Sequence, residues 1–200
     1  MPFCIGKHNS VLYIVFIYCC SFLIGIFTFS SLYTGQESFL FSFGPWMQCG
    51  TVSVNWGFSF DCLSLIMLLM VTFISGIVHL FSIGYMQSDN NIIKFFSFLS
   101  LFTFFMLILV SADNFIVLFL GWEGIGVCSF LLISFWNTRL QASKAALKAI
   151  ILNRIGDFGY VIAVCLSYFI FRSFDFDVVF PLVPYFSGLY QPFIFGFNLS

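Results

Sequence analysis

Apolar residues run through this chain in long blocks, and short polar connections separate the blocks. A helix of about 20 apolar residues is long enough to cross the hydrocarbon core of a membrane. The pattern therefore predicts five membrane-spanning helices that pack as one bundle. Their expected ranges are Val11–Leu32, Phe58–Ile83, Ile92–Val110, Asn114–Trp136 and Ser143–Phe171.

Two longer connections follow a different pattern. Polar and apolar residues alternate from Thr51 to Trp56, which indicates a short strand or hairpin, and tryptophans favour the headgroup region. We therefore expect residues 33–57 to form a loop or hairpin at the membrane interface. Residues 172–200 contain three prolines and are expected to be an irregular tail. The whole chain, 1–200, is expected to be a single membrane domain.

Composition supports the same fold class, an all-α membrane protein. Hydrophobic residues make up 61% of the 200 residues and charged residues only 8%, with a mean hydropathy of +1.07. Soluble domains contain about 25% charged residues, so this chain has too few to cover a surface that faces water. The net charge of -1 indicates neither an acidic nor a basic partner, and the absence of a basic stripe argues against a nucleic-acid partner.

Basic residues also agree with five spans. If the helices alternate in direction, one side of the membrane carries Lys7, Lys94, Arg139 and Lys144, and the other carries only Arg172. Basic residues collect on the cytoplasmic or matrix side of membrane proteins. The N-terminus and the connections near Lys94 and Arg139 are therefore expected on that side.

Glu123 is the main candidate for a functional side chain. It lies within Gly-Trp-Glu-Gly-Ile-Gly at residues 121–126, near the centre of the fourth expected helix. A charge at that depth costs several kcal/mol unless it is paired, hydrated or protonated, and such residues often mark ion or proton pathways. The alternative is a structural hydrogen-bond anchor between helices. The neighbouring glycines allow close approach of another helix or a local distortion.

Arg154 and Asp157 form a second intramembrane cluster, with Lys148 six residues before Arg154. Their i, i+3 spacing puts Arg154 and Asp157 on one helix face. With a rise of about 1.5 Å per residue, Glu123 lies about 18 Å from one end of its helix, and Arg154 and Asp157 lie about 17 and 21 Å from the same side. The three side chains are therefore expected to meet in a polar axis that could relay protons without a metal.

Three other polar residues have competing interpretations. His79, near one end of the second helix, could relay protons or could simply be a polar helix end. Asp61 is expected to cap or anchor the start of that helix, where the helix dipole favours an acid. Asp113 is expected to be the N-cap of the fourth helix. No cysteine pattern, P-loop or dinucleotide fingerprint is present, so no cofactor or metal is expected on this chain.

Several segments, in order and spacing, resemble NADH dehydrogenase subunit 5, the distal antiporter-like subunit of respiratory complex I. They are Phe60-Asp-Cys-Leu-Ser-Leu-Ile-Met-Leu68, Ile74-Ser-Gly-Ile-Val-His-Leu-Phe-Ser-Ile-Gly-Tyr-Met86, Leu99-Ser-Leu-Phe-Thr-Phe-Phe-Met106, Ala112-Asp-Asn114, Leu118-Phe-Leu-Gly-Trp-Glu-Gly-Ile-Gly126 and Asn153-Arg-Ile-Gly-Asp157. The resemblance covers about residues 50–170.

The resemblance implies a proton-pumping function and roles for individual residues. Glu123 matches the key intramembrane glutamate of the family, and Arg154 and Asp157 match the pair in the next helix. Lys148 and His79 match polar positions of many members. The implied location is the mitochondrial inner membrane, with flavin mononucleotide, iron–sulfur clusters and ubiquinone held by other subunits. The expected partners are the other membrane-arm subunits of complex I and membrane lipids, with cardiolipin as one candidate.

The chain departs from the family in length. It begins at the usual second helix, and it ends before the helix whose lysine partners the glutamate. We therefore expect either a second chain that supplies the remaining helices or a truncated copy that serves assembly only. A third interpretation is a subunit of a multisubunit cation/proton antiporter, although Phe-Asp-x-Leu-Ser and Leu-Phe-Thr-Phe-Phe-Met favour complex I.

Overall fold

The computed structural model describes residues 7–33, 38–50, 52–87, 89–187, 193–194 and 197–198. Within these residues, five helices are long and apolar enough to cross a membrane. They are α2 (Lys7–Tyr33), α3 (Cys62–Tyr85), α4 (Ile92–Ser111), α5 (Phe115–Ile133) and α6 (Leu140–Phe171). The prediction of an all-α membrane fold with five spans is confirmed.

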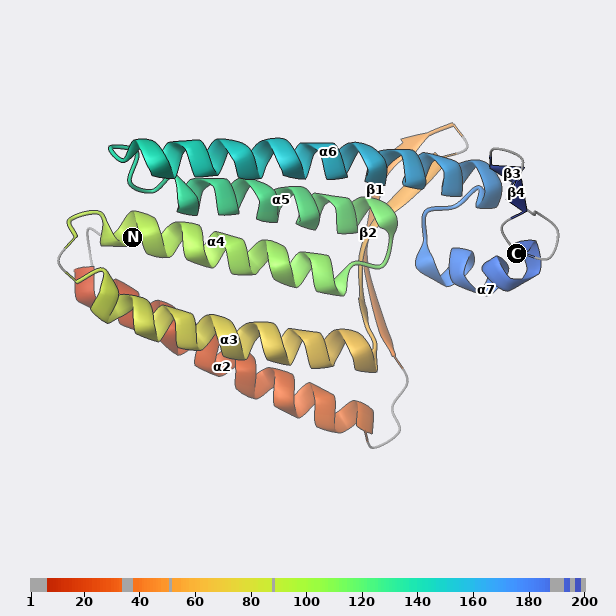
Figure 1. The fold of residues 1–200 in the computed structure, drawn as a ribbon. Coiled ribbons are helices and arrows are strands. Elements are labelled where there is room, and N and C mark those ends of the chain that lie inside the picture. Colours follow the sequence, from red (N-terminus) through yellow and green to blue (C-terminus); the bar gives the residue numbers. More distant parts are fainter. Residues whose placement is uncertain are drawn as a thin grey trace.

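The five helices lie side by side in chain order, and neighbours run in opposite directions (Figure 1). Each helix packs mainly against the helices that precede and follow it in the sequence, and α2 also touches α4. Such a row has two open faces. Large apolar side chains remain exposed on it, among them Phe81 at 73% and Phe158 at 72%. Lipid or further helices must therefore cover these faces.

Helix boundaries differ from the expected ones where another hydrogen-bonding pattern competes. Helix α3 begins at Cys62 rather than Phe58, because residues 58–60 pair in a strand. Helix α6 begins at Leu140 rather than Ser143, since the carbonyl of Arg139 already accepts hydrogen bonds from the backbone N–H groups of residues 142 and 143. Helix α5 begins at Phe115 and ends at Ile133, three residues before the expected end.

A two-stranded antiparallel hairpin connects α2 to α3. Strand β1 (Phe39–Cys49) pairs with β2 (Val52–Phe60), and β1 has two irregularities, between Ser42 and Gly44 and between Pro45 and Met47. Trp46 and Trp56 pack edge to face with their ring centroids 4.9 Å apart. In Figure 1 the hairpin runs across the ends of the helices at one side of the row. The hairpin thus continues past residue 57, the end of the expected interfacial segment.

The expectation of an irregular tail is wrong for Phe176–Ser187, which form helix α7. Pro181 and Pro184 lie inside this helix and remove two backbone donors. Aromatic packing offsets that loss, because the ring of Phe176 packs 4.8 Å from Phe115 at the start of α5 and 5.2 Å from Phe180. Short strands β3 (Phe193–Ile194) and β4 (Phe197–Asn198) follow; residues 188–192 lie outside the described part.

Candidate functional site: a charge cluster between α5 and α6

Glu123 reaches its place because α5 packs very closely on α4. A Cβ atom added at Gly121 would lie 2.8 Å from the backbone of Leu109 on α4, and one at Gly124 would collide with the ring of Phe105. Only glycine allows this contact, which is the usual reason for small residues at membrane helix interfaces. The glycines thereby fix the rotation of α5. Glu123, between them in sequence, lies toward α6 and away from α4.

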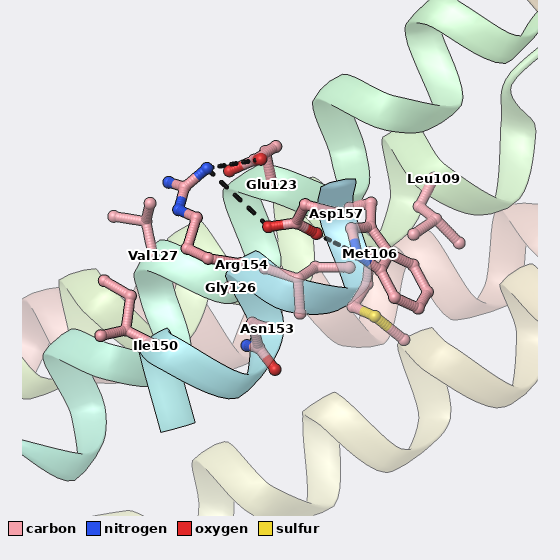
Figure 2. Close-up of a pocket in the computed structure, with 11 residues that line it drawn as sticks. Met106, Leu109, Glu123, Gly126, Val127, Ile150, Asn153, Arg154 and Asp157 are labelled. Atoms are coloured by element: carbon pink, nitrogen blue, oxygen red, sulfur yellow. Dashed lines mark hydrogen bonds and ion pairs between the residues drawn. The ribbon is translucent and has the colours of Figure 1, made fainter. Parts of the chain in front are cut away.

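Arg154 of α6 joins the two carboxylates of the site. Its Nη1 atom lies 2.6 Å from Oε1 of Glu123 and 3.8 Å from Oδ2 of Asp157 (Figure 2). The first contact is a charge-assisted hydrogen bond, and the second is a looser ion pair within the same helix. The contact that the depth estimate predicted between the fourth and fifth spans is therefore present.

Trp122 is a member of the site that the sequence analysis did not single out. Its indole N–H donates a hydrogen bond of 2.9 Å to Oδ1 of Asp157. A tryptophan inside a membrane needs an acceptor for that N–H group, and the carboxylate of the next helix supplies it. Because Trp122 directly precedes Glu123, α5 contacts both Asp157 and Arg154 of α6. The signal in the sequence was an aromatic donor beside an intramembrane acid.

The site lines a pocket of about 340 Å³ between α4, α5 and α6. Its polar members differ in exposure, since the side chain of Arg154 is 56% exposed, that of Glu123 is 23% exposed and that of Asp157 is 10% exposed. Met106 of α4 forms part of the wall, as Figure 2 shows. The arginine therefore lies at the open side of the pocket and the aspartate at its closed side.

The charges in this pocket do not balance. Two carboxylates share one guanidinium, so the cluster carries one net negative charge when both acids are ionised. Uptake of one proton makes it neutral. In a medium of low dielectric constant the neutral and charged forms differ strongly in energy, and movement of any nearby charge shifts the balance between them. The arrangement can therefore store and release one proton.

The structure does not bring the other two predicted site residues into this cluster. Lys148 is exposed on α6, and its six-residue distance from Arg154 corresponds to about 9 Å along a helix. Among the described residues, both ion pairs of the cluster involve Arg154 and neither involves Lys148. His79 lies on α3, fully buried and outside the pocket of Glu123. It is thus not an exposed polar helix end.

The two predicted helix caps have different outcomes. Asp61 is the N-cap residue of α3, where its backbone N–H donates a hydrogen bond of 2.7 Å to Oγ of Ser64. Asp113 is not the N-cap of α5, and that prediction is wrong. Asn114 takes the position, and its Oδ1 accepts a hydrogen bond of 2.8 Å from the backbone N–H of Val117. Asparagine suits this cap position because its Nδ2 can also donate a hydrogen bond, which a carboxylate cannot.

Asp113 instead lies among acidic residues outside the membrane-spanning helices. Its backbone carbonyl accepts a hydrogen bond of 3.1 Å from the N–H of Phe176 at the start of α7. Burial raises the pKa of Asp113 above its ordinary value, and the nearby carboxylates of Asp175 and Asp177 raise it further. Burial also raises the pKa of Asp175, with a smaller contribution from Asp177.

Two family models match this chain. Residues 46–96 match the N-terminal part of chain 5 of NADH-ubiquinone oxidoreductase, or complex I, and residues 112–195 match the transmembrane domain of NADH:quinone oxidoreductase and Mrp antiporters. Together they cover more than half of the chain. The chain belongs to the family of complex I chain 5. The charge cluster lies wholly within the second matched region.

Relatives in this family are similar over most of the chain. It is 52% identical over 162 residues to NADH-ubiquinone oxidoreductase chain 5 of Dictyostelium discoideum, a match that covers 78% of this chain and 24% of the relative. It is 51% identical over 140 residues to NADH-quinone oxidoreductase subunit L of Rickettsia bellii, covering 70% of this chain and 22% of that one. The chain thus spans about a quarter of the length of these family members.

A solved structure shares the arrangement of helices. The membrane-bound sulfane sulfur reductase, an archaeal respiratory membrane complex, contains a chain that superposes with a TM-score of 0.72 over 86% of this chain and 34% of its own length. The sequences are 20% identical. This likeness shows that the two chains share a fold.

Proposed function

We propose that this chain contributes the Glu123–Arg154–Asp157 cluster to the proton relay of an antiporter-like subunit in proton-translocating NADH:ubiquinone oxidoreductase. The observation that carries the proposal is the shared guanidinium, which lies 2.6 Å from one carboxylate and 3.8 Å from the other between two membrane helices. A purely structural anchor needs one acid for one base. The second acid adds a site where a proton can be held.

The chemistry of the relay follows from the two distances. When Arg154 is close to Glu123, that carboxylate is neutralised by the ion pair and Asp157 is the acid with the weaker partner. A shift of the guanidinium toward Asp157 exchanges the roles of the two acids. Each exchange releases a proton from the acid that gains the arginine and favours protonation of the acid that loses it. The exposed side of Arg154 lets a neighbouring charge drive that shift.

Lys148 and His79 serve this relay at a distance. Lys148 lies on α6 between Arg154 and the basic side of the membrane. From there its ammonium group favours, at long range, the ionised form of the carboxylates of the cluster. His79 belongs to a separate buried region between α2, α3 and α4. In this proposal it is reached by protons through water rather than by contact with the charge cluster.

The open faces of the helix row support a place within a larger assembly. A complete channel needs further helices against α5 and α6, supplied by other residues of the same polypeptide or by a second chain. The proposed partners are the membrane-arm subunits of complex I together with membrane lipid, cardiolipin included. The proposed location is the mitochondrial inner membrane, which the eukaryotic relatives support. Flavin mononucleotide, iron–sulfur clusters and ubiquinone belong to other subunits.

Replacement of Glu123 in the assembled native complex tests the proposal. Glu123→Gln keeps the size and a hydrogen-bond acceptor for Arg154 but cannot bind a proton. We expect it to lower NADH-driven proton translocation by about a hundredfold, the lower end of the usual contribution of a proton-transfer group. Asp61→Asn is the matched control, because it removes an acid at a helix cap and keeps the capping ability.

The same preparation separates this function from two others. If Glu123→Gln assembles and pumps as the unaltered complex does, the cluster is a structural anchor and the chain serves assembly. If the isolated complex contains no flavin or iron–sulfur subunits and exchanges cations for protons, the chain belongs to a multisubunit antiporter. Mass spectrometry of the complex identifies the polypeptide that carries the remaining helices.

A further inference from the structure

The two carboxyl oxygens of Asp157 have different partners. Oδ1 accepts a hydrogen bond of 2.9 Å from the indole N–H of Trp122, and Oδ2 lies 3.8 Å from Nη1 of Arg154 (Figure 2). The indole belongs to α5 and the guanidinium to α6. The side chain of Asp157 is only 10% exposed, so water has little access to either oxygen. The surroundings therefore make the two oxygens of one carboxyl group unequal.

The indole determines which oxygen of Asp157 can carry a proton. An indole N–H can only donate, so Oδ1 accepts from it whether the acid is ionised or protonated. In a protonated carboxyl group the oxygen without the proton is the acceptor for such a donor. A single hydrogen bond favours one of two otherwise equal forms by about tenfold. When Asp157 holds a proton, that proton is therefore on Oδ2, the oxygen nearer to Arg154.

The two donors to Asp157 also differ in how firmly they are held. Trp122 directly follows Gly121, whose close contact with the backbone of Leu109 fixes the position of α5 on α4. The indole N–H therefore keeps its direction toward Oδ1. The guanidinium of Arg154 is at the end of a long side chain that is 56% exposed, so it is free to change its partner. One donor is fixed on Oδ1, and the other moves toward and away from Oδ2.

We propose that Trp122 is a positioning residue, which makes the proton and the guanidinium compete for one oxygen, Oδ2 of Asp157. When Arg154 leaves Glu123 and reaches Oδ2, the Oδ2–H bond breaks and the proton passes to Oε1 of Glu123, which the guanidinium has left. The reverse step returns both to their first places. Nη1 already lies near both acids, so the exchange needs only a small shift. This inference rests on the proposed function of the cluster and adds the residue that couples the two movements.

Without the indole N–H this competition is lost. The two oxygens of Asp157 become equivalent, and the proton can rest on Oδ1 while the guanidinium of Arg154 contacts Oδ2. Asp157 then keeps its proton during the exchange, and the movement of the arginine transfers nothing. Because two equal oxygens share the proton, about half of the exchanges are unproductive. The loss therefore concerns the number of protons moved per exchange, and the cluster itself stays assembled.

Two substitutions in the intact complex, reconstituted into vesicles, separate the N–H group from the bulk of the ring. Trp122→Phe keeps an aromatic ring and removes the donor. Trp122→His loses the larger ring and keeps an N–H group at the corresponding ring position. We expect Trp122→Phe to lower the number of protons translocated per NADH oxidised by up to about half, and Trp122→His to retain the original ratio. Trp136→Phe is the matched control, because Trp136 lies beyond the end of α5 and does not border the pocket.

An unchanged ratio in Trp122→Phe overturns the inference. A low ratio in both variants also overturns it, since the bulk of the ring and not its N–H group is then required. If Trp122→Phe is normal while Glu123→Gln is defective, the proposed function stands and this inference falls; if Glu123→Gln is also active, both fall. Where neither Trp122 variant assembles, a high-resolution map of the unaltered complex decides. We expect Nε1 of Trp122 within about 3 Å of one oxygen of Asp157, and an indole bonded to another acceptor overturns the inference.

Discussion

This molecule has two polar centres between packed segments, and they differ in how their polar groups are paired. The cluster of Glu123, Arg154 and Asp157 lies between two membrane helices, uses full charges and is open on one side. The turn between α4 and α5 lies outside the spans and is closed around Asn114, which is 0% exposed. The cluster has one acid more than it has bases. The side chain of Asn114 at the turn bonds two backbone groups, of Asn55 and Val117, and the carboxylate of Asp113.

The connections around the turn show what its closure achieves. Asn114 donates a hydrogen bond of 2.8 Å to the carbonyl of Asn55 in β2 while it caps α5. Phe115 donates to the carbonyl of Phe174, just before α7, and accepts from the hydroxyl of Tyr160 in α6. Hairpin, α5, α6 and α7 therefore meet at one point. The comparison teaches that hydrogen bonds to backbone groups of several segments fix a structure, whereas two acids that share one base leave a site able to change its protonation.

The largest structural effect is expected at the turn. Asn114→Ala removes the cap of α5 and the bond to the hairpin and leaves the carbonyl of Asn55 unpaired. We expect a loss of about 3 kcal/mol in the free energy of unfolding, from a cap and a buried hydrogen bond together. Asn91→Ala is the control, since Asn91 is the N-cap residue of α4 but makes no capping bond.

Thermal denaturation of the assembled complex and its yield measure this difference. Equal midpoints for the Asn114 and Asn91 variants would show that the turn does not hold the four elements together. Arg154→Gln should have the reverse pattern, with impaired proton translocation and a small change in thermal stability, if the two centres have separate roles.

A smaller effect is expected where α5 packs on α4 beneath the charge cluster. Gly121→Ala would place a methyl group 2.8 Å from the backbone of Leu109, which cannot move as a flexible side chain does. We expect a loss of about 2 kcal/mol from overpacking, with a shift of Glu123 that also slows proton translocation. Gly126→Ala meets only the side-chain amide of Asn153 at 3.6 Å and should cost less than about 0.5 kcal/mol.

Thermal midpoints of the two alanine variants, measured side by side, decide this point. If Gly126→Ala proves as damaging as Gly121→Ala, the cost comes from a general need for glycine in α5, and close packing on α4 is not its cause.

The smallest expected effect is a dependence of thermal stability on pH that comes from Asp113. Its raised pKa means that the folded state holds this proton at pH values where the unfolded state has lost it. The contribution of Asp113 to stability therefore falls as the pH rises from the ordinary pKa of an aspartate through the raised value. Asp113→Asn should remove this fall, so that thermal stability changes less across that range. A stability profile that Asp113→Asn leaves unchanged would contradict the effect of burial and of Asp175 and Asp177.

Much of the fold follows from local sequence. Apolar blocks of membrane-spanning length determined the five helices, because a bilayer leaves a backbone of that length no other hydrogen-bonded form. The rise per residue and the short connection between α5 and α6 also predicted that Glu123 meets Arg154 and Asp157. Both inferences require only that these segments form regular helices, and they do.

Other features were decided only by tertiary contacts. The choice of Asn114 over Asp113 as a cap depends on a carbonyl of the hairpin, 59 positions away in the sequence. Helix α7 forms despite two prolines because the ring of Phe115 in α5 packs against it. His79 is buried because Tyr18 and Phe96 come from two other helices. The sequence by itself determined the spans and the level of each charge within them, and the packing of distant segments determined which polar groups are satisfied and which remain free to bind a proton.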